Sequence, residues 1–128
     1  SSHLVAANNT ALGSGAASVE QNGTLEIATG FTVGNAVTIN AGTILVNGTA
    51  SGAVSFGASG GTLGGDGTIN GAVTVNNVNQ VLSPGNSPEI LKFNTGETWS
   101  SYTYVWELND WTTSVAGANF DQVGITFF

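Results

Sequence analysis

The stretch GGTLGGDGTINGAVTV, residues 60–75, decides the fold because it is one copy of a repeat with a period of nineteen residues. Its first element, Gly-Thr followed by Leu or Ile, occurs at residues 23–25, 42–44 and 61–63. Gln80-Val81-Leu82 lies nineteen positions further on and keeps the apolar residue. The second element has copies at residues 36–39, 53–56 and 72–75, spaced by seventeen and nineteen, and an earlier copy at residues 16–19. Internal repeats of this length are typical of solenoids.

Each second element alternates apolar residues with Thr or Ser, as Val73 and Val75 do around Thr74. This alternation predicts a strand with one face buried. A single repeat cannot bury that face alone, whereas stacked repeats pair each strand with its copy in the next coil, about 4.8 Å away. We therefore expect an all-β fold, a parallel β-solenoid of four to five coils. An antiparallel sandwich is the alternative, but it gives no reason for a nineteen-residue phase.

The six glycines of residues 60–75 admit three interpretations. A phosphate-binding loop would lead into a helix and carry a lysine, and neither is present. Calcium-bound solenoids use GGxGxD repeats with aspartates in successive coils, but Asp66 has Asn47 before it and Gly85 after it at the nineteen-residue spacing. Turn glycines, which tolerate positive φ, are the favoured interpretation. Asp66 remains the single weak candidate for calcium, and no cofactor is expected.

The composition excludes several classes of partner. Only 7% of residues are charged, against about 25% in an ordinary soluble domain, while 41% are apolar. Lys92 is the only Lys or Arg, and eight acidic residues give a formal net charge of −7. Binding to nucleic acid or to anionic membranes requires basic residues, so neither is expected.

No apolar run reaches the length of a membrane span, about 18 residues. With no cysteine, no methionine and Ser1 as its first residue, the chain is expected to be a processed product or a segment of a longer precursor.

Three stretches together resemble a known family: residues 8–48, the repeat at 60–75, and LSPGNSPEILKF at 82–93. They are similar to the autotransporter-associated β-strand repeat, also called the passenger-associated transport repeat. The resemblance covers roughly residues 4–126 and includes the closing YVWELND and ANFDQVGITFF. It implies a secreted bacterial surface protein, a right-handed parallel β-helix, a role in export and folding of a larger passenger, and no catalytic residues. Glu89 departs from the family, which often has Gly there.

The residue pattern of the sequence changes after the repeats. We expect residues 1–98 to form the solenoid and residues 99–128 to add capping or interface strands to the same domain. YTYVWEL at 102–108 predicts one strand with an aromatic face, and GITFF predicts another. The candidate cap or interface residues are Tyr102, Tyr104, Trp106, Leu108, Trp111, Phe127 and Phe128. A cap over the last coil, a subunit interface, and a sugar-stacking platform built from Trp99, Trp106 or Trp111 remain open.

Catalytic groups are sparse. Polysaccharide lyases of similar shape need basic residues, and Lys92 is the only one here. A hydrolase needs two carboxylates about 5–9.5 Å apart, for which Glu107, Asp110 and Asp121 form the only plausible cluster. Their alternative role is as turn and edge residues. His3 is the only histidine and lies in the first residues, so it is a poor candidate for a catalytic base or metal ligand, and cysteine is absent. The chain is therefore predicted to be non-enzymatic.

Three functions are compatible with these observations. The first is an extracellular structural module that self-associates through its solenoid ends into a fibre, stalk or surface layer. The second is an adhesin that binds a glycan or another cell-surface ligand. The third is a segment that helps a larger passenger to be exported and to fold.

Overall fold

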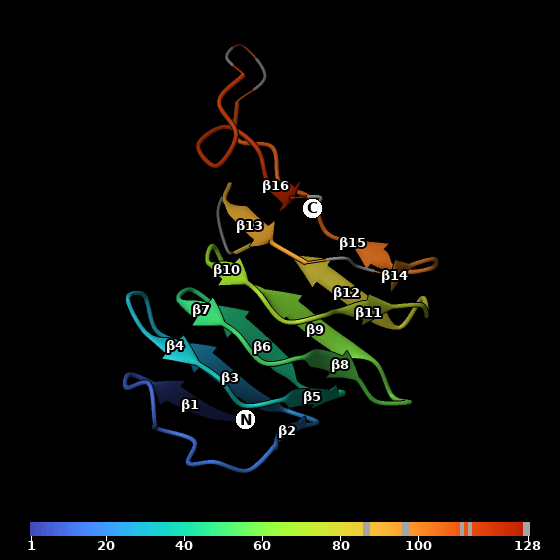
Figure 1. The fold of residues 1–128 in the computed structure, drawn as a ribbon. Coiled ribbons are helices and arrows are strands. Elements are labelled where there is room, and N and C mark those ends of the chain that lie inside the picture. Colours follow the sequence, from blue (N-terminus) through green and yellow to red (C-terminus); the bar gives the residue numbers. More distant parts are fainter. Residues whose placement is uncertain (86–87, 96–97, 111, 113, 127–128) are drawn as a thin grey trace.

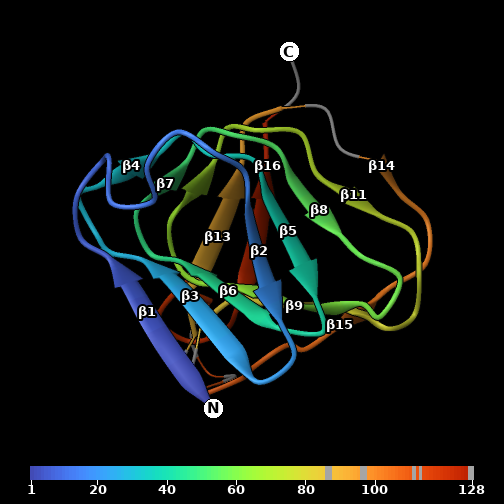
Figure 2. The same cartoon turned by 90° about the horizontal axis from the view of Figure 1, so that it is seen from below.

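The computed structural model describes residues 1–85, 88–95, 98–110, 112 and 114–126, and these residues form strands and turns without a helix. The strands stack as a parallel β-solenoid of about five turns (Figure 1), so the predicted fold class is confirmed. Seen along the solenoid axis, the strands lie on three faces around a common interior (Figure 2). Each regular coil contributes one strand to each face.

The first sheet, which has six strands, extends along the whole solenoid. In stacking order its strands are β1 (Ser2–Ala6), β3 (Gly23–Ile27), β6 (Thr43–Val46), β9 (Gly61–Gly64), β12 (Gln80–Ser83) and β15 (Thr103–Tyr104). The second sheet stacks β4 (Thr32–Val33), β7 (Thr49–Ala50), β10 (Thr68–Ile69), β13 (Ile90–Phe93) and β16 (Gln122–Ile125). The third face stacks β2 (Ala17–Glu20), β5 (Val37–Asn40) and β8 (Val54–Phe56), followed by β11 (Thr74–Val75) and β14 (Thr98–Trp99).

The strand register reproduces the predicted period. In the first sheet Thr43 pairs with Thr62, and Thr62 pairs with Val81, so each step is nineteen residues. On the third face Val37 pairs with Val54, the seventeen-residue step seen in the sequence. Every pairing between two named strands is parallel.

Stacked apolar side chains form the core, because inward positions of successive strands lie in register. The first sheet contributes one continuous ladder, which is Leu4, Leu25, Ile44, Leu63, Leu82 and Tyr104. The second sheet contributes Val33, Ala50, Ile69, Phe93 and Ile125. The four middle members of the first ladder are at most 4% exposed. Burial of these side chains is the main stabilising contribution in a fold that has few charges.

The structure explains the glycines of residues 60–75 in two ways. Gly65 has φ of +107°, a conformation that side-chain-bearing residues rarely adopt, as expected for a turn. Gly67 and Gly71 instead lie where successive coils are close. A Cβ on Gly67 would be 2.1 Å from the backbone oxygen of Gly48, and one on Gly71 would be 1.9 Å from that of Gly52. The sequence predicted the turn but not this close approach between coils.

The predicted strand at residues 102–108 is wrong in its extent. Strand β15 includes only Thr103–Tyr104, and Val105 still donates its N–H to the oxygen of Leu82. Beyond it the chain leaves the sheet, and Leu108 forms an isolated antiparallel bridge with Phe120. Residues 106–110, 112 and 114–121, here called the projection, rise past the last coil (Figure 1). Hydrogen bonds within the projection replace the sheet pairing that the alternation predicted.

Candidate functional site: the two ends of the solenoid

Both ends of the first ladder are exposed. Leu4 begins the ladder and is 59% exposed, and Tyr104 ends it and is 39% exposed. The residues between them are buried because each has a neighbour above and below, whereas no further coil among the described residues covers the first or the last member. Each end therefore exposes a side chain of the core ladder that a further coil would cover.

At the C-terminal end the predicted aromatic residues divide into two groups. Trp99 is half-buried and packs edge-on against Phe93, with ring centroids 5.1 Å apart, and against Tyr102 at 5.6 Å. It covers part of the core there, and its indole N–H is buried without a hydrogen-bond partner among the described residues. The remaining candidates are largely exposed, at 38% for Tyr102, 50% for Trp106 and 49% for Leu108. Trp111, Phe127 and Phe128 lie outside the described residues.

Asp121 holds the projection to the solenoid. Its side chain is buried, and its carboxylate accepts the backbone N–H of Glu89 at 2.9 Å and that of Glu107 at 3.0 Å. The backbone of Asp121 also accepts the indole N–H of Trp106 at 2.9 Å. Burial, then the charge of Asp121, then Tyr102 raise the pKa of the Tyr104 hydroxyl above its ordinary value. The carboxylate thus joins three segments that are far apart in sequence.

The arrangement gives the acidic cluster a structural explanation. The Asp110 carboxylate accepts the backbone N–H and hydroxyl of Thr112 at 2.8 and 2.7 Å, as in an Asx-turn. Asp121 is enclosed, and its two oxygens are bound by backbone donors. The backbone of Glu107 takes part in the same network, because its N–H donates to the Asp121 carboxylate and its C=O accepts the N–H of Asp121. The contacts of Asp110 are those of a turn residue, whereas the burial of Asp121 differs from the edge charge that the sequence suggested.

The other candidates do not meet in one site. Asp66 is exposed, and the side chain of Asn47, in the preceding coil, donates to Glu26 at 3.0 Å. His3 contacts Glu26 through its Nε2 at 2.9 Å on the outer face of the first sheet. Among the described residues there is no group of three or more acidic or histidine side chains placed to hold a metal ion. The described part of the chain also has no helix long and apolar enough to cross a membrane.

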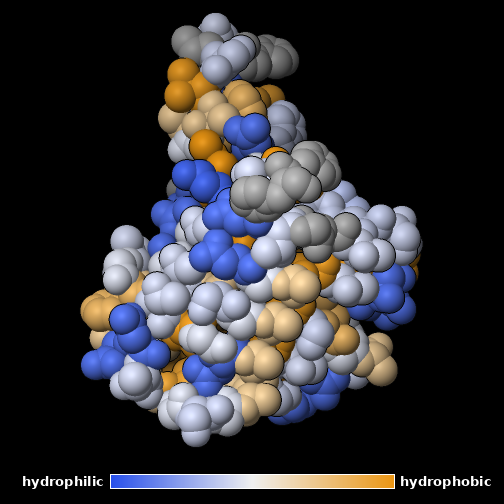
Figure 3. Space-filling model, viewed as in Figure 1, coloured by the Kyte–Doolittle hydropathy of each residue, from blue (hydrophilic) through white to orange (hydrophobic). Residues whose placement is uncertain are grey.

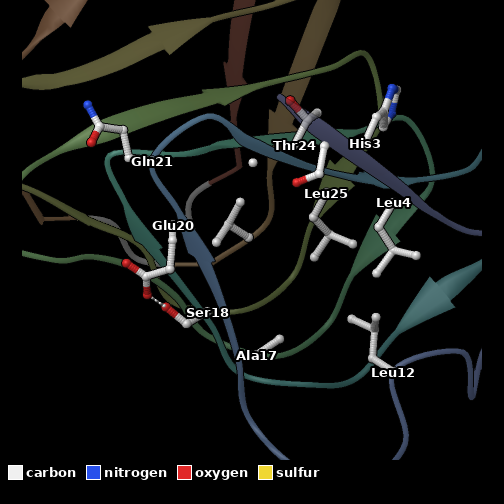
Figure 4. Close-up of a pocket in the computed structure, with 12 residues that line it drawn as sticks. His3, Leu4, Leu12, Ala17, Ser18, Glu20, Gln21, Thr24 and Leu25 are labelled. Carbon is white, nitrogen blue, oxygen red and sulfur yellow. Dashed lines mark hydrogen bonds between the residues drawn. The ribbon is translucent and has the colours of Figure 1, made fainter.

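A cavity of about 370 Å³ opens at the N-terminal end, and sequence reasoning missed it. Its apolar lining includes Leu4, Leu12, Ala17, Val19 and Leu25 (Figure 4). Glu20 lies at its rim, where hydrogen bonds from Ser18 at 2.5 Å and Asn40 at 2.7 Å lower the pKa of its carboxyl. The sequence signal that was missed is a first copy of the repeat around Leu4. Leu4 lies twenty-one residues before its partner Leu25, and not nineteen, so the fixed spacing did not reveal this copy.

Comparison with known proteins returned no match to a family model, a curated protein or a solved structure.

Proposed function

We propose that this chain is a non-enzymatic structural module that self-associates through the ends of its solenoid. The observation that carries this proposal is the exposure of both ends of one continuous core ladder, at Leu4 and at Tyr104. Stacking a second molecule on such an end extends the ladder of side chains and the strand pairing in one step. The interior then continues from one molecule into the next.

Composition and contacts support a structural role. The chain has few charged residues, and polar side chains pair between coils: Asn94 donates to Asn70 at 2.9 Å, and the Thr38 and Ser55 hydroxyls are 3.2 Å apart. Such contacts reinforce stacking and leave few reactive groups on the surface. Extracellular or bacterial cell-surface localisation fits this composition and the resemblance to autotransporter-associated repeats, and is part of the proposal.

A glycan-binding or adhesive role is the second candidate. It is favoured by the exposed rings of Tyr102, Tyr104 and Trp106 within one short segment, because sugars stack on exposed aromatic faces. The export and folding role implied by the resemblance is a third candidate, and it requires a longer passenger around this segment.

Light scattering over a concentration series, with negative-stain electron microscopy of the same samples, tests the proposal. Mass that rises with concentration, with particles longer than one solenoid, is the expected result. Monomers at every concentration, together with binding to members of a glycan array, would favour the adhesive role. Loss of that binding in Trp106→Ala, but not in Val78→Ala, would assign it to the aromatic segment.

A further inference from the structure

The sequence contains three Asn-Gly steps, which are Asn22-Gly23, Asn47-Gly48 and Asn70-Gly71. Asparagine is a chemically labile residue. It reacts fastest before glycine, because glycine has no side chain to keep its backbone nitrogen away from the asparagine amide. The three steps share this chemistry in the unfolded chain. Any difference between their reactivities in the folded protein therefore comes from the structure.

The reacting groups of Asn47-Gly48 are both held in place. The Asn47 side chain donates to the carboxylate of Glu26 at 3.0 Å. The N–H of Gly48 donates to the backbone oxygen of Ile27 at 2.9 Å. Gly48 is also buried against the preceding coil, because a Cβ there would be 2.3 Å from the backbone oxygen of Ala28. The nitrogen of Gly48 can approach the Asn47 amide only if these contacts break.

Asn70-Gly71 is held between two neighbouring coils. The Asn70 side chain is exposed, but its oxygen accepts an N–H of Asn94 in the following coil at 2.9 Å. A Cβ on Gly71 would be 1.9 Å from the backbone oxygen of Gly52, and the oxygen of Gly71 accepts the hydroxyl of Thr95 at 3.1 Å. The coils lie in contact along the stack (Figure 3), so this backbone has little room to move.

Asn22-Gly23 differs from both of these steps. It lies at the turn between β2 and β3 (Figure 2), where Asn22 is exposed and has a φ of +65°. Among the described residues, no hydrogen bond holds the Asn22 side chain. Gly23 is less confined than Gly48 and Gly71, because the atom nearest to a Cβ there, the oxygen of Glu20, would be 3.1 Å away. This step therefore combines an unheld amide with room for backbone movement.

We propose that Asn22 is a site of spontaneous modification in the folded protein, and that the coil stack protects Asn47 and Asn70. The nitrogen of Gly23 loses its proton to solvent and attacks Cγ of Asn22. A C–N bond forms, the amide nitrogen of the side chain leaves as ammonia, and a cyclic imide results. Water then opens this ring at either carbonyl, which gives aspartate or isoaspartate. Water is the only other reactant.

The modification changes the turn in two ways. Both products replace a neutral amide with a carboxylate two residues after Glu20. Isoaspartate also lengthens the main chain by an additional carbon atom between Asn22 and Gly23. The backbone oxygen of Asn22 accepts the N–H of Ser2 at 3.1 Å, so this change disturbs the register of β1 against β3 at that point. The inference is independent of the proposed self-association.

Peptide mass spectrometry of the natural chain, kept folded in mildly alkaline buffer, tests the inference. We expect deamidation of Asn22 to be at least about tenfold faster than that of Asn47 and Asn70, which requires local opening of the stack. Isoaspartate in the Asn22 peptide, detected with an isoaspartate methyltransferase, identifies the cyclic route. In urea the three steps should react at comparable rates, because they share the same dipeptide. Equal rates in the folded chain, or a slower rate at Asn22, would overturn the inference.

Two substitutions of Glu26 test the protection of Asn47. Glu26→Ala removes the acceptor of the Asn47 amide, so we expect deamidation of Asn47 to become several-fold faster. Glu26→Gln keeps a carbonyl acceptor and should change that rate far less. Asn70 serves as the internal reference in both variants, and circular dichroism shows whether each remains folded. Equal Asn47 rates in the two folded variants would overturn the protective role assigned to this hydrogen bond.

Discussion

Replacement of Asp121 by Asn isolates the contribution of one buried carboxylate that joins three segments. Both carboxylate oxygens accept backbone N–H groups, from Glu89 and Glu107. The amide of Asn keeps one acceptor and turns an NH₂ group toward the other N–H. A hydrogen bond to a charged group contributes about 1.5–3 kcal/mol, and an unsatisfied buried donor costs about 1–3 kcal/mol. Allowing for relaxation around the site, we expect a loss of about 2–4 kcal/mol.

The loss should be local, since the projection can open while the coils remain folded. Hydrogen exchange with mass spectrometry should show exchange in residues 102–126 accelerated about 30-fold to 700-fold, as this free energy requires. Peptides from β6 and β9 should keep their protection. Asp66→Asn is the matched control, because it removes the same charge from an exposed turn and should change stability by no more than about 0.5 kcal/mol. Equal protection of residues 102–126 in the two variants would refute the role assigned to Asp121.

Three further predictions concern the coils themselves. Gly71→Ala places a Cβ against a backbone oxygen of the preceding coil and should destabilise the chain by about 1–3 kcal/mol in urea unfolding. Gly15→Ala, which meets no atom within 4 Å, should not, and equal effects would contradict the close-approach explanation. Leu63→Ala, in the middle of the core ladder, should cost about 2–5 kcal/mol, whereas Leu108→Ala should cost far less, and the urea midpoints of the two variants measure this difference. Glu20 has a lowered carboxyl pKa, so its stabilisation is present above its unfolded pKa, near 4.5, and is lost as the pH falls through the lower folded value. Glu20→Gln should therefore reduce the difference in Tm between about pH 6 and about pH 3, and an unchanged difference would contradict this assignment.

Much of the regular solenoid could be predicted because its information is local and repeated. The alternation of apolar and polar residues assigns Val37 and Ile39 to the interior, and both are buried. The constant spacing then specifies register, since a shift of one residue would turn every apolar side chain outward. The turn glycine at Gly65 follows from the same phase, because each coil turns at an equivalent place.

The last coil was harder to predict because its spacing is irregular. Ile90 pairs with Gln122, thirty-two residues later, so no phase indicates the partner. The alternation at residues 102–108 predicted one long strand, but the Asp121 carboxylate accepts the backbone N–H of Glu107. A local sequence pattern cannot show which distant carboxylate will accept the backbone N–H groups that a strand would otherwise use for sheet pairing.

By itself, the sequence determined which residues face the core and how far apart their copies lie, since both follow from a short pattern repeated at a fixed period. Only the tertiary structure decided that Leu4 and Tyr104 are exposed members of a ladder whose middle is buried. The physical reason is that burial in a solenoid depends on the coils above and below. The same apolar side chain is core in one coil and exposed in the last.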